Sequence, residues 1–188
     1  SVVEIGSGCN VFSDEAGQET ATFRHFIAGQ QACMADFTAL FAPNVNSYQR
    51  LCHPYASPNN ACWSHDNRAA GLRIPASLPV ARRVENRLPG ADANPYLAIA
   101  ASLAAGLHGI ENALEPSAPI QGEFAVPDNL SLPCTLHAAL ERLKRSQLAK
   151  ELFGAEFIEG YIASKTLELT SFYDEITPWE RRVLAAQA

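Results

Sequence analysis

The sequence predicts an α+β fold that is mostly helical and has a few antiparallel strands. Apolar residues recur at helical spacing in three stretches, at 20–41, 94–112 and 135–175. Short extended segments bounded by turn-forming residues come between the first two stretches, at 61–66, 67–75 and 82–87. The chain has 188 residues and is 47% hydrophobic, which suits one domain or part of one.

The first two long helices begin at capping residues. Thr20 has the side chain of an N-cap, and the apolar pattern after it indicates a helix to about residue 41. The second helix begins with Asn94, followed by Pro95, which needs no N–H partner in the first turn. It runs to about Asn112 and is apolar on nearly all sides, so we expect it to be buried.

The C-terminal third contains further helices, expected at about 135–145, 147–153 and 155–175. Gly154 is a stop signal between the last two. Thr177 and Glu180 have the spacing of a capping box and begin a terminal helix. Turn-forming residues are frequent in the segments 43–60 and 115–133, which we expect to be loops.

The charge balance excludes some classes of partner. A net charge of −6 and a pI near 5.3 argue against binding to nucleic acid or to an anionic membrane surface. No apolar run is long enough to span a bilayer. The start of the chain has neither the character of a signal peptide nor an initiator Met, so we expect it to lie inside a larger protein or to follow processing.

The cysteines indicate a reducing compartment. They are irregularly spaced and include no Cys-x-x-Cys pair, so we interpret them as the reduced, mostly buried thiols of a cytoplasmic protein. An alternative is a zinc site built from Cys52, His53, Cys62 and His65, although structural zinc sites normally use separated pairs of ligands.

A row of charged side chains in the segment 82–87 is the strongest candidate for a functional site. Alternation along a strand would point Arg83, Glu85 and Arg87 to the same face. Two guanidinium groups around one carboxylate suit a bound cation, a phosphate or a second carboxylate. The alternative is a surface ladder of ion pairs. Against it, Arg68 and Arg73 lie nearby among apolar or small neighbours.

Four motifs carry a resemblance to a known family. They are Asn-Arg-x-Ala-x-x-Arg-Ile-Pro at 67–75, Arg-Arg-x-Glu-x-Arg at 82–87, Asn-Pro-Tyr-Leu-Ala at 94–98 and Ala-Gly-Leu-x-Gly-Ile-Glu-Asn at 105–112. In this order and spacing the chain resembles the C-terminal part of a glutamine synthetase catalytic domain. The resemblance implies that 1–188 is that C-terminal portion, and that the N-terminal β-grasp domain and the first part of the catalytic domain would precede it.

The resemblance also implies an activity. Members of the family use ATP to join the γ-carboxylate of glutamate to ammonia or an amine through γ-glutamyl phosphate. They require Mg²⁺ or Mn²⁺, and they form homo-oligomeric rings, dodecamers among them, with sites between subunits. The expected partners are therefore glutamate, ATP and an amine, in the cytoplasm.

Roles in phosphoryl transfer follow from the matched motifs. By resemblance, Arg68 would be catalytic, because it stabilises the transferring phosphoryl group. Arg73, Arg83 and Ser1 would bind ATP, with Ser1 closing a His-x-His-x-Ser strand of the family. Glu85 would be a ligand of the metal that bridges the ATP phosphates, since hard cations take oxygen ligands.

Roles in substrate binding fall to two more arginines. Arg50 and Arg87 would bind the carboxylate of substrate glutamate, Arg87 through a bidentate fork. The loop after Arg50 has Ala56 where glutamine-forming members carry a Glu that helps to bind and deprotonate ammonium. This departure favours the branch that makes γ-glutamyl amides of polyamines or other amines.

Two other functions are compatible with the sequence. One is a non-catalytic relative of glutamine synthetase with a structural or regulatory role, which the residue at position 56 and the small number of metal ligands favour. The other is a helical interaction module with a surface ladder of Arg and Glu. That module requires the arginines and Glu85 to be exposed and to point in unrelated directions.

Overall fold

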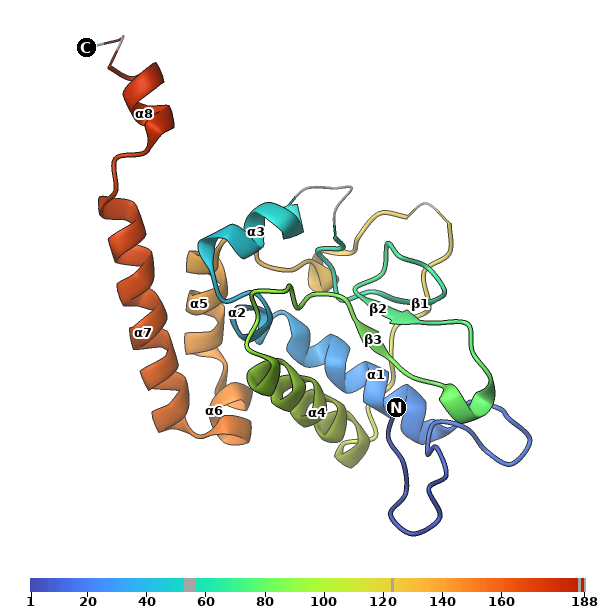
Figure 1. The fold of residues 1–188 in the computed structure, drawn as a ribbon. Helices are drawn as coiled ribbons and strands as arrows, with labels where there is room; N and C mark the ends of the chain where they lie inside the picture. Colours follow the sequence, from blue (N-terminus) through green and yellow to red (C-terminus); the bar gives the residue numbers. More distant parts are fainter. Residues whose placement is uncertain (53–56, 123, 186, 188) are drawn as a thin grey trace.

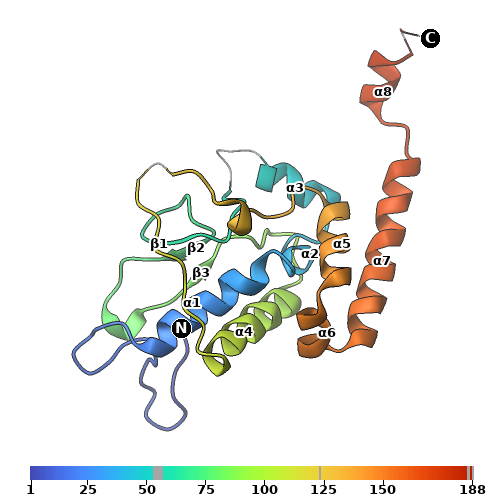
Figure 2. The same cartoon turned by 180° about the vertical axis from the view of Figure 1, so that it is seen from behind.

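A computed structural model describes residues 1–52, 57–122, 124–185 and 187. Figure 1 shows a body in which α1 (Ala21–Met34) and α4 (Pro95–Glu111) lie beneath a small sheet, with a helical arm at one side. The predicted fold class is confirmed. Seen from behind, the two body helices still lie side by side, and the arm stands apart from the sheet (Figure 2).

The contact between α1 and α4 forms the centre of the body. Thr20 caps α1, since its Oγ1 accepts a hydrogen bond from the N–H of Phe23 at 3.2 Å. A Cβ atom added at Gly29 would lie 2.0 Å from the carbonyl oxygen of Ala105, so the two helices approach at backbone distance. The first helix is shorter than predicted, because turns follow Met34 before the short helix α2 (Thr38–Phe41).

The prediction that the second long helix is buried holds for one face only. Ala98, Ala101 and Ala105 on α4 are buried. In contrast, large apolar side chains on its other face are exposed: Tyr96, Ile99, Leu103 and Leu107. The prediction fails on that face because α4 packs closely against α1 and α2 on one side, which leaves these larger side chains open to solvent.

The sheet is small and mixed. It consists of β1 (Trp63–His65), β2 (Leu72–Ile74) and β3 (Glu85–Asn86) in that order. The predicted antiparallel pairing occurs between β2 and β3, whereas β1 runs parallel to β2. A 3-10 helix, η1 (Pro79–Ala81), lies in the connection between β2 and β3.

The segment 43–60, predicted as a loop, contains the helix α3 (Val45–Cys52). The many turn-forming residues of this segment favoured a loop, although Tyr48 and Leu51 lie three residues apart, as on one face of a helix, and are both buried. At the start of the helix, the N–H of Asn44 donates to Oγ of Ser47 at 3.1 Å. This correction matters because α3 carries Arg50 into the site described below.

The arm follows the predicted helices closely. It comprises α5 (Leu136–Arg145), α6 (Gln147–Phe153), α7 (Ala155–Asp174) and α8 (Pro178–Val183), preceded by the 3-10 helix η2 (Asp128–Leu130). Gly154 has a φ of +86° between α6 and α7, as its role as a stop predicts. The predicted capping box of Thr177 and Glu180 is present. Within the residues that the structure describes, no helix is long and apolar enough to cross a membrane.

Candidate functional site

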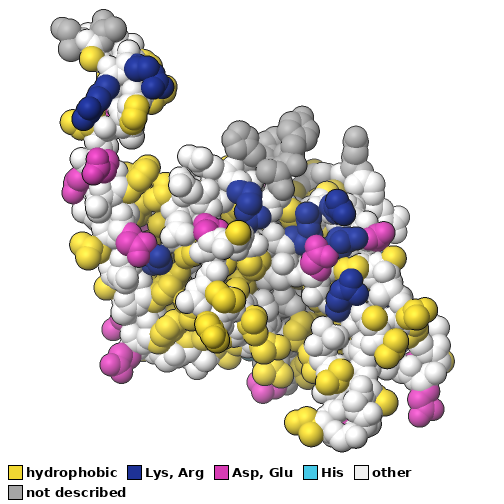
Figure 3. Space-filling model, in the orientation of Figure 1, with side chains coloured by type: hydrophobic (Ala, Val, Ile, Leu, Met, Phe, Trp, Pro, Cys, Tyr) yellow, Lys and Arg dark blue, Asp and Glu magenta, His cyan; other side chains and the backbone are white. Residues whose placement is uncertain are grey.

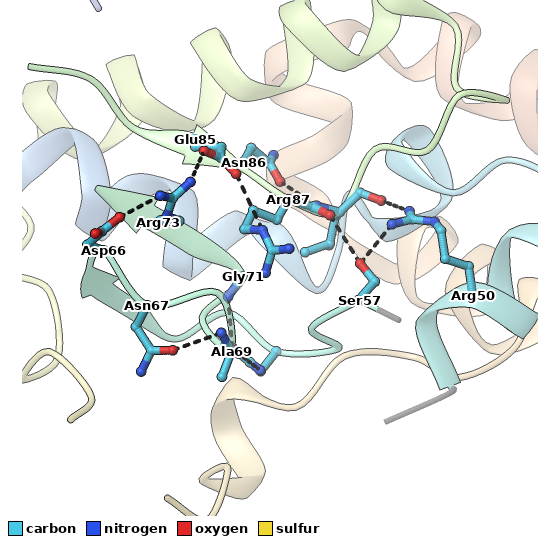
Figure 4. Close-up of polar contacts among 12 residues, drawn as sticks. Arg50, Ser57, Asp66, Asn67, Ala69, Gly71, Arg73, Glu85, Asn86 and Arg87 are labelled. Carbon is cyan, nitrogen blue, oxygen red and sulfur yellow. Dashed lines mark hydrogen bonds and ion pairs between the residues drawn. The ribbon is translucent and has the colours of Figure 1, made fainter. Parts of the chain in front are cut away.

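The pairing of β2 with β3 places Glu85 between two arginines. Arg73 and Glu85 are register partners across the two strands, and Nη1 of Arg73 lies 3.0 Å from Oε2 of Glu85. The other carboxylate oxygen, Oε1, lies 3.4 Å from Nε of Arg87. Figure 4 shows the carboxylate held between the two guanidinium groups. The cross-strand register thus brings together charges that lie twelve or more residues apart in sequence.

Arg73 is also held by a second carboxylate. Its Nη2 lies 2.5 Å from Oδ1 of Asp66, a residue with a φ of +44°. This hydrogen bond holds the pKa of the Asp66 carboxyl below its usual value, and it raises the pKa of Arg73. With two carboxylates on its terminal nitrogens, Arg73 is fixed in one orientation beside Glu85.

Helix α3 brings Arg50 to the same region. Its Nη1 donates to Oγ of Ser57 at 2.7 Å, and its Nη2 donates to the carbonyl oxygen of Leu88. Oγ of Ser57 donates in turn to the carbonyl oxygen of Arg87 at 3.3 Å. These bonds join α3 to the chain just after β3, and Figure 4 shows Arg50 and Arg87 meeting at Ser57.

A hollow of about 530 Å³ opens beside these arginines, and we call it the basic hollow. Arg68 and Arg87 are among its lining residues. Burial lowers the pKa of Arg87, and the positive charges of Arg68, Arg73 and Arg50 lower it further against the opposing effect of Glu85. Nη1 of Arg87 is buried without a hydrogen-bond partner among the described residues.

The charges around the basic hollow favour an anionic ligand. In the space-filling view, Lys and Arg side chains gather over the sheet with only a few acidic groups among them (Figure 3). A buried guanidinium nitrogen without a partner is costly, and a phosphate or carboxylate oxygen would satisfy it. The convergence of four arginines contradicts the interaction-module alternative, which required them to point in unrelated directions.

Arg83 and Ser1 lie apart from this group. Nη1 of Arg83 donates to the carbonyl oxygen of Ala81 at 3.2 Å, and β3 is too short to include this residue. The predicted row of three therefore holds for Glu85 and Arg87 but not for Arg83. Ser1 is not among the residues that line the basic hollow, and it lines a different one.

Ser1 lines a second hollow, which we call the apolar groove. It has a volume of about 430 Å³ and lies between β3 and α4. Val84 and Asn86 line it, whereas Glu85 and Arg87 belong to the arginine cluster. Alternate residues of the extended segment 84–87, whose centre is β3, therefore face different sides. The side chain of Asn86 donates to Oγ of Ser102 on α4 at 3.3 Å.

Glu85, the one residue predicted to bind Mg²⁺ or Mn²⁺, lies within the arginine cluster. Glu85 could supply one carboxylate oxygen to Mg²⁺, an ion that commonly takes one or two protein carboxylates together with phosphate oxygens. Over 1–52, 57–122, 124–185 and 187, no group of three or more potential ligand side chains could hold a metal ion. The described residues can therefore supply one ligand, Glu85, to a bound metal ion, and the remaining ligands would come from phosphate oxygens, water or other protein segments.

The alternative zinc site is not formed by its described members. His53 and Ala56 both lie outside the described residues. Cys62 is fully buried, and His65 lies 3.4 Å from Glu19, with Nε2 facing Oε1. Cys52 instead contacts Cys134. The residues proposed for zinc therefore have separate partners.

The structure adds polar residues that sequence reasoning missed. Asp66 precedes the first arginine motif, but only the left-handed backbone at that position and the strand register reveal its contact with Arg73. Asp92 accepts a 2.5 Å hydrogen bond from Oγ of Ser47 on α3. That bond, together with one from Asn44 and the charge of Arg50, holds the pKa of Asp92 below its usual value despite partial burial. No local sequence signal indicates these contacts.

Comparison with known proteins identifies relatives over most of the chain. The family model described as "Glutamine synthetase, catalytic domain" matches residues 1–184. A γ-glutamylethanolamide synthetase of Streptomyces coelicolor is 42% identical over 168 residues, which are 89% of this chain and 36% of that protein. A γ-glutamylputrescine synthetase of Escherichia coli is 38% identical over 173 residues, or 92% of this chain and 37% of that protein.

A glutamine synthetase of Thermus thermophilus is also 38% identical, over 183 residues that are 92% of this chain and 41% of that protein. The chain thus spans about two fifths or less of the length of these three curated relatives.

Proposed function

Because the chain belongs to the glutamine synthetase family, whose catalytic domain it matches over residues 1–184, we propose that it forms part of an ATP-dependent ligase. The reaction we propose joins the γ-carboxylate of glutamate to an amine through γ-glutamyl phosphate. The observation that carries this proposal is the cluster of Arg50, Arg68 and Arg73 around Arg87. Within it, Glu85 pairs with Arg73 and Arg87, and Arg68 and Arg87 line one hollow. All three relatives named above are synthetases, which favours catalysis over the non-catalytic alternative.

The arginine cluster suits the charge changes of phosphoryl transfer. The γ-phosphoryl group passes between two anions, so positioning and charge neutralisation carry most of the rate. Arg68 lines the hollow and would contact the transferring phosphoryl group. Glu85 would hold Mg²⁺ or Mn²⁺, which when bound neutralises phosphate charge. Arg73, fixed by two carboxylates, would contact the ATP phosphates through its buried Nε, which has no partner among the described residues.

The substrate glutamate would bind at the other end of the cluster. Arg87 has a buried guanidinium nitrogen without a described partner, and Ser57 links the guanidinium group of Arg50 to the backbone carbonyl of Arg87. Two guanidinium groups in this arrangement can bind a carboxylate with several charged hydrogen bonds. We assign both residues to the carboxylates of glutamate. We assign Arg83 and Ser1 to ATP, with Ser1 facing it from the apolar groove that Ser1 lines.

We further propose that residues 1–188 are the C-terminal portion of a longer catalytic domain. The share of the relatives that the chain covers supports this, and so does the exposed apolar face of α4. A homo-oligomeric ring is supported by exposed apolar residues along α7 and up to α8, such as Leu167, Ile176 and Trp179. A cytoplasmic location is supported by the free thiols of all the cysteines.

The acceptor we propose is an organic amine in preference to ammonia. The support is the Ala at position 56, together with relatives named for ethanolamide and putrescine products. The test is a phosphate-release assay on the longest natural form of the protein, with ATP, glutamate, Mg²⁺ and a panel of ethanolamine, putrescine, isopropylamine and ammonium. We expect an organic amine to stimulate phosphate release more than ammonium does. Release that no member of the panel stimulates would overturn the proposed reaction.

A further inference from the structure

Two thiols far apart in sequence lie side by side at the edge of the basic hollow. Cys52 ends α3, and Cys134 lies two residues before α5 begins. The Cys52 thiol donates a hydrogen bond to the carbonyl oxygen of Cys134 at 3.1 Å. Burial raises the pKa of Cys52 to about 11, helped by a hydrogen bond with the Cys134 thiol and by the charge of that thiol. The two sulfur atoms are therefore neighbours.

The other cysteines do not share this arrangement. Cys33 and Cys62 are fully buried, whereas Cys9, Cys52 and Cys134 are exposed, so the expectation that most of the thiols are buried is wrong. The backbone of Cys9 bonds to Glu4 and Ser7 in the N-terminal segment. Cys9 is thus a natural control, since it is exposed but has no described thiol neighbour.

A side-chain donor faces the sulfur of Cys134. Nδ2 of Asn59 lies 3.0 Å from this sulfur, and it also donates to the carbonyl oxygen of Leu132 at 3.3 Å. A hydrogen bond to sulfur stabilises negative charge on it, and the thiolate is the form that attacks a disulfide. Cys134 is therefore suited to react first, with Cys52 in place to resolve the product.

We propose that Cys52 and Cys134 are a redox-sensitive pair that a small-molecule disulfide, such as glutathione disulfide, converts into a protein disulfide. The Cys134 thiolate attacks one sulfur of the small disulfide, which releases one small thiolate and leaves a mixed disulfide. The Cys52 thiolate then attacks the sulfur of Cys134 and expels the second small thiolate. The two protein thiols lose two electrons and two protons, which reduce the small disulfide to two thiols.

The disulfide would change the shape of the basic hollow. Cys52, Asn59 and Cys134 line this hollow together with Arg68 and Arg87. A disulfide bond holds its sulfurs at about 2.05 Å, well inside the distance of two thiols in contact. Its formation draws the end of α3 toward the segment before α5 and removes the Cys52 thiol as a donor. We expect a narrower hollow and weaker binding of polyanions, a consequence that rests on the proposed function.

The disulfide itself can be tested without any ligand. The protein is equilibrated with mixtures of glutathione and glutathione disulfide, quenched with acid, alkylated and digested with chymotrypsin, which can cut between Cys52 and Cys62 after Tyr55. Mass spectrometry should find peptides of Cys52 and Cys134 joined, in amounts that follow the redox ratio. Cys52→Ser and Cys134→Ser should abolish the link, and Cys9→Ser should leave it unchanged. Mixed disulfides with glutathione alone, or two free thiols throughout, would overturn the proposal.

The effect on the hollow has a separate readout. Isothermal titration calorimetry with tripolyphosphate should show several-fold weaker binding to the oxidised protein than to the reduced protein, with recovery after dithiothreitol. In the double variant Cys52→Ser/Cys134→Ser, which can form neither the protein disulfide nor a mixed disulfide at this site, the same oxidant should leave the affinity unchanged. Equal binding by the linked and reduced forms would overturn the coupling between disulfide and hollow. If the reduced protein does not bind tripolyphosphate, the anion site of the proposed function fails, and the linkage result still decides the thiol pair.

Discussion

The basic hollow and the apolar groove are similar in size, but they differ in chemistry and in how they are built. The basic hollow, of about 530 Å³, depends on guanidinium groups whose charges influence one another. The apolar groove, of about 430 Å³, is lined mainly by apolar residues of α1, α4 and the segment around β3. Glu85 and Arg87 belong to the charged cluster, whereas Val84 and Asn86 line the groove.

The contrast shows how one short extended segment, 84–87, can contribute to two binding regions. Alternation along it separates a surface that recognises charge from a surface that recognises shape. If both regions bind parts of ATP, substitutions that change charge should act through the basic hollow, and substitutions that change side-chain size should act through the apolar groove.

The largest effect should come from Arg87, whose side chain has a carboxylate partner and a buried nitrogen with no hydrogen-bond partner among the described residues. Charged hydrogen bonds are each worth about 1.5–3 kcal/mol, so we expect Arg87→Ala to lower kcat/KM for glutamate about a hundredfold or more. Arg87→Lys should recover little of it, because lysine lacks the fork.

Arg145→Ala is the matched control for this change. Arg145 is an exposed arginine on α5 whose ion pair is with Glu141 in the same helix. It should keep nearly full activity in the same phosphate-release assay. An equal loss of kcat/KM in Arg87→Ala and Arg145→Ala would show that Arg87 has no specific role in binding glutamate.

The second effect concerns the helix pair that forms the floor of the apolar groove. At Gly29 an added Cβ would lie 2.0 Å from the carbonyl oxygen of Ala105 and 2.6 Å from the N atom of Gly109. Both are backbone atoms, so the helices must separate, and we expect Gly29→Ala to lower the free energy of unfolding by about 3 kcal/mol.

Gly160→Ala is the matched control, and we expect it to raise the free energy of unfolding that urea denaturation measures. Gly160 lies inside α7, and an added Cβ there has no neighbour within 4 Å. Alanine is the better helix former, so this variant should be more stable by about 0.5–1 kcal/mol. A Gly29→Ala protein as stable as the parent would mean that α1 and α4 are not packed at backbone distance.

The third effect tests whether the groove responds to size. Ser102→Phe would place a ring in the groove beside Asn86. We expect KM for ATP to rise several-fold while KM for glutamate changes little, because the arginine cluster is untouched. Ser164→Phe, on the exposed face of α7, is the control. A parallel rise in both KM values would show that the two hollows are not separate in function.

The parts of the fold that the sequence predicted correctly depend on residues that lie close together in the chain. Thr20, Asn94 and Thr177 each cap a helix through contacts within three residues, and these helix starts are confirmed. The charges around Glu85 were also accessible, because the arginines lie in recognisable motifs. What the structure adds is that Arg50, Arg68 and Arg73 lie close enough to Arg87 for their charges to act on it.

The missed features depend on long-range contacts. Helix α3 is rich in turn formers, and Tyr48 and Leu51 become a buried face only when the body is assembled. The open face of α4 has an apolar sequence and no described partner, so composition alone predicted burial. Asp66 reaches Arg73 because its backbone has a φ of +44° and because the register of β2 brings Arg73 near it. The residue types alone predict neither feature.

The smallest effect should come from Asp66, at the exposed edge of the arginine cluster. Arg73 holds the pKa of this carboxyl below its ordinary value of 3.8. A lowered folded-state pKa stabilises the protein above the unfolded-state pKa, and the contribution is lost as the pH falls through the folded value. Asp66→Asn should therefore lower the free energy of unfolding slightly at pH 7, by an amount that shrinks below pH 3.8. Asparagine tolerates the left-handed backbone, so strain should not contribute.

Urea unfolding at neutral and acidic pH measures the difference in free energy of unfolding between Asp66→Asn and the parent, with the exposed Glu159→Gln as control. A difference that is constant with pH would argue against the Asp66–Arg73 pair.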